Sequence, residues 1–137
     1  MSDAEAFFDT NVLLYILSAD VAKADRAEAL LADGGVISVQ VLNEFAAVAS
    51  RKLSMSLADI REILAAVRAA CRVEPLSIET HDRALAIVER FRLSFYDALI
   101  CAAAALAECR VLYSEDMQDG QTIDGVVVRN PFAGHAG

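Results

Sequence analysis

The sequence has no surplus of positive charge. Twelve lysines and arginines stand against twenty aspartates and glutamates, which gives a formal net charge of −8 at pH 7. A protein that binds nucleic acid through a broad basic surface would be basic, so this mode of binding is excluded. Either nucleic acid is no partner, or it is bound locally while the carboxylates cluster elsewhere, on divalent cations for example.

The chain also has no long hydrophobic run. Its longest uncharged apolar stretch, residues 98–107, has about half of the ~20 residues that a membrane-spanning helix needs. The first five residues carry two acids where an export signal needs a basic region. We therefore expect a cytoplasmic protein that does not contact the membrane, and a hydrophobic content of 56% predicts a sizeable core.

Residues for zinc binding and for nucleophilic catalysis are scarce. Cys71, Cys101 and Cys109 are odd in number and lack metal-ligand spacing, which favours buried free thiols over a disulfide or a zinc site. No Ser-His-Asp or Cys-His set is visible. A glycine-rich nucleotide loop is absent as well, because Gly34 and Gly35 are not followed by the spacing of such a loop.

Short apolar segments alternate with longer segments of helical periodicity. We expect strands at 5–8, 36–37, 72–76, 111–113 and 126–128, and helices at 11–18, 21–32, 38–52, 56–71, 78–91 and 94–107. This alternation is typical of βαβ units, so it predicts an α/β fold with a mainly parallel sheet and helices on both faces. We expect one domain over residues 1–137, with its core at about 5–131 and a loose tail at 132–137.

Four acidic residues lie where strands end or helices begin. Asp9 directly follows the first strand, Asp116 follows the fourth, and Glu44 and Asp97 lie in the first two turns of two helices. Ligands of an open parallel sheet bind beyond the carboxyl ends of its strands, so the four acids can converge there. Packed carboxylates repel one another, and Mg²⁺ or Mn²⁺, which prefer oxygen ligands, would relieve that repulsion.

Each acid also has a purely structural interpretation. Asp9 suits the N-cap of a helix, and Asp97 stands three residues after Ser94, the spacing of a capping box. Asp116 and Asp119 could each shape a turn, and Glu44 could extend into solvent from the edge of its helix. Taken together, acids at successive strand ends and helix starts are harder to explain by chance.

Four segments resemble, in order and spacing, the acidic motifs of PIN-domain ribonucleases, and the match is best with VapC-type toxins of toxin–antitoxin modules. The segments are Phe8-Asp9-Thr10-Asn11-Val12-Leu13-Leu14, Asn43-Glu44, Ser94-Phe95-Tyr96-Asp97-Ala98-Leu99-Ile100 and Leu112-Tyr113-Ser114-Glu115-Asp116-Met117. The resemblance covers about residues 6–131. It implies a three-layer fold with five parallel strands in the order 3-2-1-4-5, metal-dependent cleavage of RNA, a homodimer and a tight-binding VapB-type antitoxin.

The resemblance also implies roles for individual residues. Asp9, Glu44, Asp97 and Asp116 match the acids that bind Mg²⁺, for which Mn²⁺ can substitute; Asp119 is the alternative fourth acid, and Asn11 and Ser114 match supporting polar positions. Outside the motifs, Arg51 and Lys52 are candidates for contacts with RNA phosphates.

Two other functions stay open at this point. A PIN-like scaffold could bind RNA or a protein partner without cutting. A haloacid-dehalogenase-type phosphatase also begins with an apolar strand that ends in Asp, but it needs a second Asp two residues later. Asn11 occupies that position here. Such an enzyme also needs a lysine in its site, and Lys23 and Lys52 are the two lysines of the chain.

Overall fold

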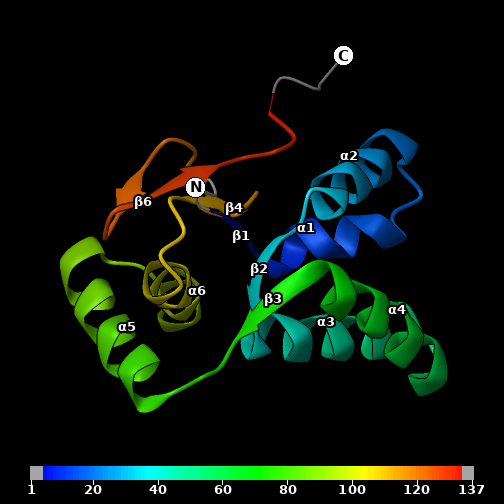
Figure 1. Ribbon diagram of the computed structural model, residues 1–137, viewed down its shortest axis with the longest axis horizontal. Helices are drawn as coiled ribbons and strands as arrows, with labels where there is room; N and C mark the ends of the chain where they lie inside the picture. The colour runs from blue at the N-terminus through cyan, green and yellow to red at the C-terminus, as the bar shows by residue number, and fades with distance from the viewer. Residues whose placement is uncertain (1–4, 134–137) are drawn as a thin grey trace.

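The structure of the protein, a computed structural model, describes residues 5–133 (Figure 1). Its strands are β1 (Ala6–Phe8), β2 (Gly35–Ser38), β3 (Cys71–Glu74), β4 (Val111–Tyr113), β5 (Thr122–Ile123) and β6 (Val126–Arg129). Its helices are α1 (Thr10–Leu14), the 3₁₀ helix η1 (Tyr15–Leu17), α2 (Val21–Ala32), α3 (Val39–Arg51), α4 (Leu57–Ala70), α5 (Ile78–Phe91) and α6 (Phe95–Leu106).

These strands form one sheet in the order β3-β2-β1-β4-β6-β5. The first five strands of this order pair in parallel, as predicted for an α/β fold, and β5 pairs antiparallel with β6 at the edge. The predicted order of the parallel strands is confirmed, with β6 as the fifth strand, but the described sheet has six strands rather than five. The additional strand is β5, which comprises only two residues.

A tight hairpin turn explains the additional strand. Asp124 and Gly125 connect β5 to β6, and both have positive φ angles, of 53° and 86°. Two consecutive residues with positive φ are typical of the type I′ turn, whose twist matches that of an antiparallel strand pair. The Asp124 carboxylate also accepts a 2.8 Å hydrogen bond from the guanidinium of Arg83 on α5, which ties the hairpin to the helical layer.

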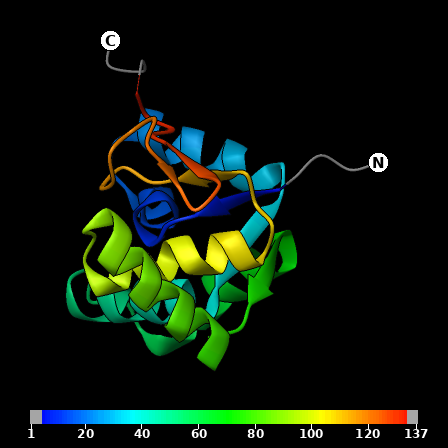
Figure 2. The same ribbon diagram turned by 90° about the vertical axis from the view of Figure 1, so that its left-hand side faces the viewer.

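Helices cover both faces of the sheet. Helices α5 and α6 lie side by side on one face, and α1 and α2 lie on the other (Figures 1 and 2). Residues Ala98 to Ala104 of α6 are all buried, because this helix lies between the sheet and α5. At the β2–β3 side of the sheet, α3 packs against α1 and α4 packs against α2.

Close packing at the centre of the sheet requires a glycine in β2. A Cβ atom on Gly35 would come within 2.4 Å of the Phe8 ring and 2.8 Å of the carbonyl oxygen of Ala6. Both contacts are shorter than van der Waals distances, so a side chain at this position would push β2 away from β1. The absence of a side chain at Gly35 thus allows β2 to lie close to β1, the strand directly before Asp9.

The chain remains packed beyond residue 131. Phe132 is 7% exposed and its ring lies edge-on to the ring of Tyr15, with 4.6 Å between the ring centroids. Phe132 thus packs against the core although it falls in the tail predicted for residues 132–137, and residues 134–137 of that tail lie outside the described residues. The three cysteines are free and buried, as predicted. Within residues 5–133, none of the helices has the length and hydrophobicity needed to cross a membrane.

Candidate active site

The site lies where β1 and β4 run side by side at the centre of the sheet. The chain moves from β1 outward to β2 and β3, and then returns to the other side of β1 as β4, so the order of the strands reverses here. Phe8 is in register with Tyr113, which places the next residues, Asp9 and Ser114, next to each other at the carboxyl ends of their strands. This is the position where open α/β sheets bind ligands.

Asp9 is both the N-cap of α1 and the most buried acid of the site. Its side chain is held by the backbone N–H of Thr10 at 2.7 Å and by the Ser114 hydroxyl at 2.8 Å. The pKa of Asp9 is raised to about 6, mainly by burial; the hydrogen bonds from Ser114 and Thr10 oppose this increase, and the charges of Asp97 and Asp116 add to it. The capping role and the site role therefore coexist in one side chain.

Two neighbours hold the carboxylate of Glu44 on α3. The Thr10 hydroxyl donates to Oε1 at 2.6 Å, and the Gln40 amide, one helical turn earlier, donates to Oε2 at 3.3 Å. The same amide nitrogen donates to the carbonyl oxygen of Tyr96 at the start of α6. Thr10 and Gln40 thus connect Glu44 to the Asp9 and Asp97 segments. These contacts argue against the alternative interpretation that Glu44 only extends into solvent.

Asp97 lies in the first turn of α6, where its backbone N–H donates to the Ser94 hydroxyl at 3.2 Å. Partial burial raises the pKa of Asp97, and the charges of Asp116 and Glu44 add to that increase. Asp116 is exposed at the rim, and its backbone N–H donates to Ser114 Oγ at 3.2 Å. The acids of four segments therefore interact electrostatically at one end of the sheet.

All four acids line one cleft of about 370 Å³, which we call the acid cleft. Its other lining residues are Thr10, Asn11, Leu14, Gln40, Ala47, Val48, Arg51, Tyr96 and Ile100. Asn11 and Arg51, both predicted from the sequence, thus lie at the cleft. Asp119 and Lys52 are not among its lining residues: Asp119 accepts a 2.8 Å hydrogen bond from the backbone N–H of Asn130, and Lys52 lines a neighbouring pocket.

The acid cleft has four carboxylates but one basic side chain, Arg51, among its described lining residues. In the described part of the chain, none of the four acids forms an ion pair with a lysine or arginine. Oxygen donors and uncompensated charge suit a divalent cation. As they stand, however, no three acidic, thiol or imidazole side chains within residues 5–133 lie close enough together to hold an ion. Thr10, Gln40 and Ser114 hold two of the carboxylates by hydrogen bonds, so cation binding requires rotation of side chains.

A polar network behind the cleft was not anticipated from the sequence. The Tyr15 hydroxyl donates to Glu115 Oε1 at 2.5 Å, and Lys23 Nζ donates to Glu115 Oε2 at 3.2 Å and to the Tyr15 oxygen at 3.1 Å. Asn11 Oδ1 accepts a longer bond, of 3.4 Å, from the Glu115 backbone N–H. These contacts fix the loop that carries Ser114 and Asp116.

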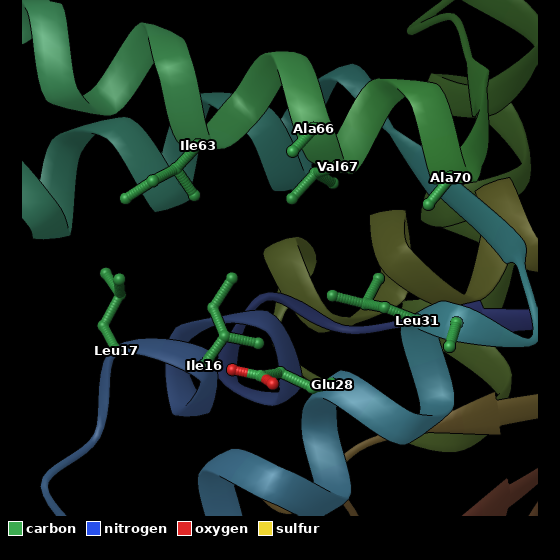
Figure 3. A pocket seen from close by; sticks show the side chains of 9 residues that line it. Ile16, Leu17, Glu28, Leu31, Ile63, Ala66, Val67 and Ala70 are labelled. Carbon is green, nitrogen blue, oxygen red and sulfur yellow. The ribbon is translucent and has the colours of Figure 1, made fainter.

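A separate apolar pocket, also of about 370 Å³, lies between η1, α2 and α4, and we call it the α2–α4 groove (Figure 3). Side chains of Ile16, Leu31 and Ile63 point into it, with Glu28 as its acidic member. It shares no lining residue with the acid cleft. The groove therefore has the character of a contact surface rather than of a catalytic site.

The fold and the cleft define an α/β protein with several carboxylates at the switch point of a parallel sheet. The family model of the PIN domain matches residues 6–118, and the chain belongs to the PIN-domain family. The resemblance inferred from the four acidic motifs is thereby confirmed. No curated protein sequence matches the chain significantly.

Solved structures of toxin–antitoxin proteins share the fold. A toxin–antitoxin complex from Klebsiella pneumoniae is 25% identical, with a TM-score of 0.70 over 92% of this chain and 97% of the other. VapC20 from Mycobacterium tuberculosis, a sarcin–ricin-loop-cleaving toxin, is 22% identical, with a TM-score of 0.63 over 81% and 89%. VapBC2 from Rickettsia felis, bound to a promoter DNA fragment, is 16% identical, with a TM-score of 0.63 over 91% and 97%.

Proposed function

We propose that the protein is a metal-dependent endoribonuclease that acts as the toxin of a toxin–antitoxin pair. The observation that carries this proposal is the acid cleft, where carboxylates from four separate segments line one cavity and none of them, in the described part of the chain, forms an ion pair with a basic side chain. Membership of the PIN-domain family and the likeness to solved VapC toxins support it.

The cleft residues divide into holding and orienting groups. Asp9, Glu44, Asp97 and Asp116 would hold Mg²⁺ or Mn²⁺, and such an ion, when bound, would activate water and stabilise negative charge on the leaving oxygen. The Ser114 hydroxyl and the Thr10 N–H orient Asp9, whereas the Thr10 hydroxyl and Gln40 orient Glu44.

Arg51 at the edge of the cleft is placed to contact a phosphate of the substrate. With water rather than the RNA 2′-hydroxyl as nucleophile, the products would carry a 5′-phosphate and a 3′-hydroxyl. Mapping the ends of the cleaved RNA distinguishes this outcome from a 2′,3′-cyclic phosphate, which would contradict the proposal.

The phosphatase alternative loses support at the same site. Neither Lys23 nor Lys52 is among the described lining residues of the acid cleft, and Lys23 instead contacts Glu115 and Tyr15. Asn11 stands where the second aspartate of that class is required. The non-cleaving scaffold remains the alternative that experiment must separate.

Cleavage of RNA by the purified chain, with and without chelator, tests the proposal. We expect activity in Mg²⁺ or Mn²⁺, its loss in EDTA, and a decrease of at least about 100-fold in Asp97→Asn, because several kcal/mol of charge stabilisation depend on the ion. Asp82→Asn, an exposed acid on α5, is the matched control. Cleavage that persists in EDTA would refute the metal mechanism, and RNA binding without cleavage would favour the scaffold.

We further propose that a VapB-type antitoxin binds the α2–α4 groove through the apolar face of a helix. The groove walls are aliphatic and Glu28 provides one acidic contact for a basic residue of the partner. The similar structures from Klebsiella pneumoniae and Rickettsia felis are of toxin–antitoxin complexes, which supports a protein partner. A homodimer, implied by the family resemblance, is part of the same proposal and is tested by light scattering of the purified chain.

A further inference from the structure

A second pocket adjoins the acid cleft between α1, η1 and the C-terminal end of α3. It has a volume of about 360 Å³, within the range of ~300–1,000 Å³ typical of small-ligand pockets. Asn11, Leu14 and Val48 line both this pocket and the acid cleft, so the two cavities are neighbours that share a wall. We call the second cavity the side pocket.

The walls of the side pocket combine apolar surface with a positive charge. Leu14, Tyr15 and Val48 supply apolar surface, and Leu53 is a large apolar side chain that is 47% exposed. Lys52 lines the same pocket and is exposed. An apolar wall beside a cation suits a flat aromatic group that is linked to an anion.

Asn11, which lines both cavities, carries a hydrogen-bond donor without a partner. Its Nδ2 atom is buried and makes no hydrogen bond within residues 5–133, although Asn11 Oδ1 accepts one from the Glu115 backbone N–H. Because a backbone N–H can only donate, this bond also fixes which end of the amide is the oxygen. A buried donor without an acceptor is costly, and rotation of the Asn11 side chain would bring this donor to an anionic or hydroxyl oxygen of a ligand.

We infer that the side pocket binds the base of the nucleotide adjacent to the scissile phosphate. This inference rests on the proposed ribonuclease function. A phosphodiester in the acid cleft would present a backbone oxygen to Asn11 and its neighbouring base to Leu53 and Tyr15, with Lys52 near the next phosphate. A paired and stacked base does not enter such a pocket, whereas a base in a single-stranded loop does.

A protein side chain is the competing occupant. The observations favour RNA, because Arg51 at the acid cleft and Lys52 at the side pocket are consecutive cations along a path that passes the carboxylates. A phosphate chain repeats its charge at each nucleotide and therefore suits two cations on neighbouring cavities. The α2–α4 groove, which has neither Arg51 nor Lys52, is the better site for an apolar helix.

Equilibrium binding tests the inference without depending on catalysis. The probes are a short single-stranded RNA oligonucleotide and an abasic ribose-phosphate oligomer of equal length, labelled for fluorescence anisotropy and bound in Mg²⁺ to protein that carries Asp97→Asn to prevent cleavage. Base stacking on a side chain is typically worth about 5- to 100-fold in affinity, so the base-bearing RNA is expected to bind more tightly by that factor.

Variants of Leu53 test whether this residue causes the tighter binding of the RNA that carries bases. Leu53→Ala is expected to weaken binding of the RNA about 5- to 10-fold and to leave the abasic oligomer unchanged, while Leu53→Phe retains the preference. Leu57→Ala, an exposed leucine on α4 away from the pocket, is the control and should change neither. Because Leu53 is exposed, these variants are not expected to impair folding.

The outcomes separate the pocket from the proposed function. Equal binding of both oligomers, no binding of either, or an effect of Leu53→Ala on antitoxin binding alone would overturn the inference. If the unmodified chain cleaves RNA and Leu53→Ala has no effect, the nuclease proposal stands and the pocket assignment fails. If the chain binds RNA through Leu53 but cleaves none, the pocket assignment stands and the nuclease proposal fails.

Discussion

Ser114 Oγ donates a 2.8 Å hydrogen bond to Asp9 Oδ2, across 105 positions of the chain. The contact forms because β1 and β4 are neighbours whose last residues, Phe8 and Tyr113, are in register. The backbone N–H of Asp9 adds a 2.9 Å bond to the Tyr113 carbonyl oxygen. Two strand ends thus hold the most buried acid of the cleft in one orientation.

The first prediction concerns stability and pH. Burial raises the pKa of Asp9 from its usual value of 3.8 to about 6, so between these values the folded state binds more protons than the unfolded state. Stability therefore falls as the pH rises from about 4 to about 6, by about 3 kcal/mol for a shift of this size, and stays lower above pH 6. We expect Asp9→Asn to remove this decrease and to raise the Tm at pH 7.5.

Urea unfolding at several pH values measures this effect. Asp82→Asn, an exposed acid, should leave the pH profile unchanged. Mg²⁺ should raise the Tm of the unmodified chain above pH 6 and have little effect on Asp9→Asn. If the stability of Asp9→Asn and of the unmodified chain depends on pH in the same way, the pKa of Asp9 is not raised in the folded state.

The second prediction concerns Ser114. Its hydroxyl stabilises the charged form of Asp9, so Ser114→Ala should raise the pKa of Asp9 further and shift the acidic limb of the pH–rate profile to higher pH. The variant also removes the acceptor for the backbone N–H groups of Asp116 and Met117, and we expect a loss of about 1–3 kcal/mol in stability. Ser50→Ala, on the exposed face of α3, is the control. An unshifted pH–rate profile would contradict the role given to Ser114.

The sequence predicts the parts of the fold that follow local patterns. The strand directly before Asp9 and the periodicity of α2 and α5 are examples. The order of the parallel strands was implied instead by the resemblance to PIN-domain ribonucleases. Strand β5 was missed because Thr122 and Ile123 are too few to show an alternation. The Asp124–Gly125 pair is a strong hairpin signal and could have revealed it.

The candidate site likewise has parts that local sequence patterns predict and parts that depend on tertiary packing. Asp9, Glu44, Asp97 and Asp116 are found from their position relative to strands and helices, and they meet at the acid cleft. Gln40 was missed, although its spacing of four residues from Glu44 places both on one helix face. The contacts of Glu115 with Tyr15 and Lys23 span 100 and 92 positions and depend on tertiary packing, which no local pattern reports.

The third prediction tests whether this network positions the loop of Asp116. Glu115→Gln keeps the size of the side chain but weakens its bonds to the Tyr15 hydroxyl and to Lys23. We expect an increase of about 3- to 10-fold in the Mg²⁺ concentration for half-maximal activity, with little change in Tm, because the network is partly exposed. Tyr15→Phe should have a similar effect. Glu62→Gln, an exposed glutamate on α4, is the control, and an unchanged Mg²⁺ requirement would exclude a positioning role.

The last prediction separates partner binding from catalysis. Ala66 lines the α2–α4 groove and is exposed, so Ala66→Glu places a charge among Ile16, Leu31 and Ile63 without disturbing the core. Burial of an unpaired charge under an apolar helix is costly, and we expect the affinity for the antitoxin to fall at least about 10-fold while cleavage of RNA stays unchanged. Ala69→Glu makes the same change on the same helix outside the groove, and the antitoxin should inhibit this variant as strongly as the unmodified chain. Equal inhibition of both variants by the antitoxin would show that its helix binds elsewhere. Loss of cleavage in Ala66→Glu would mean that the groove and the acid cleft are coupled rather than separate surfaces.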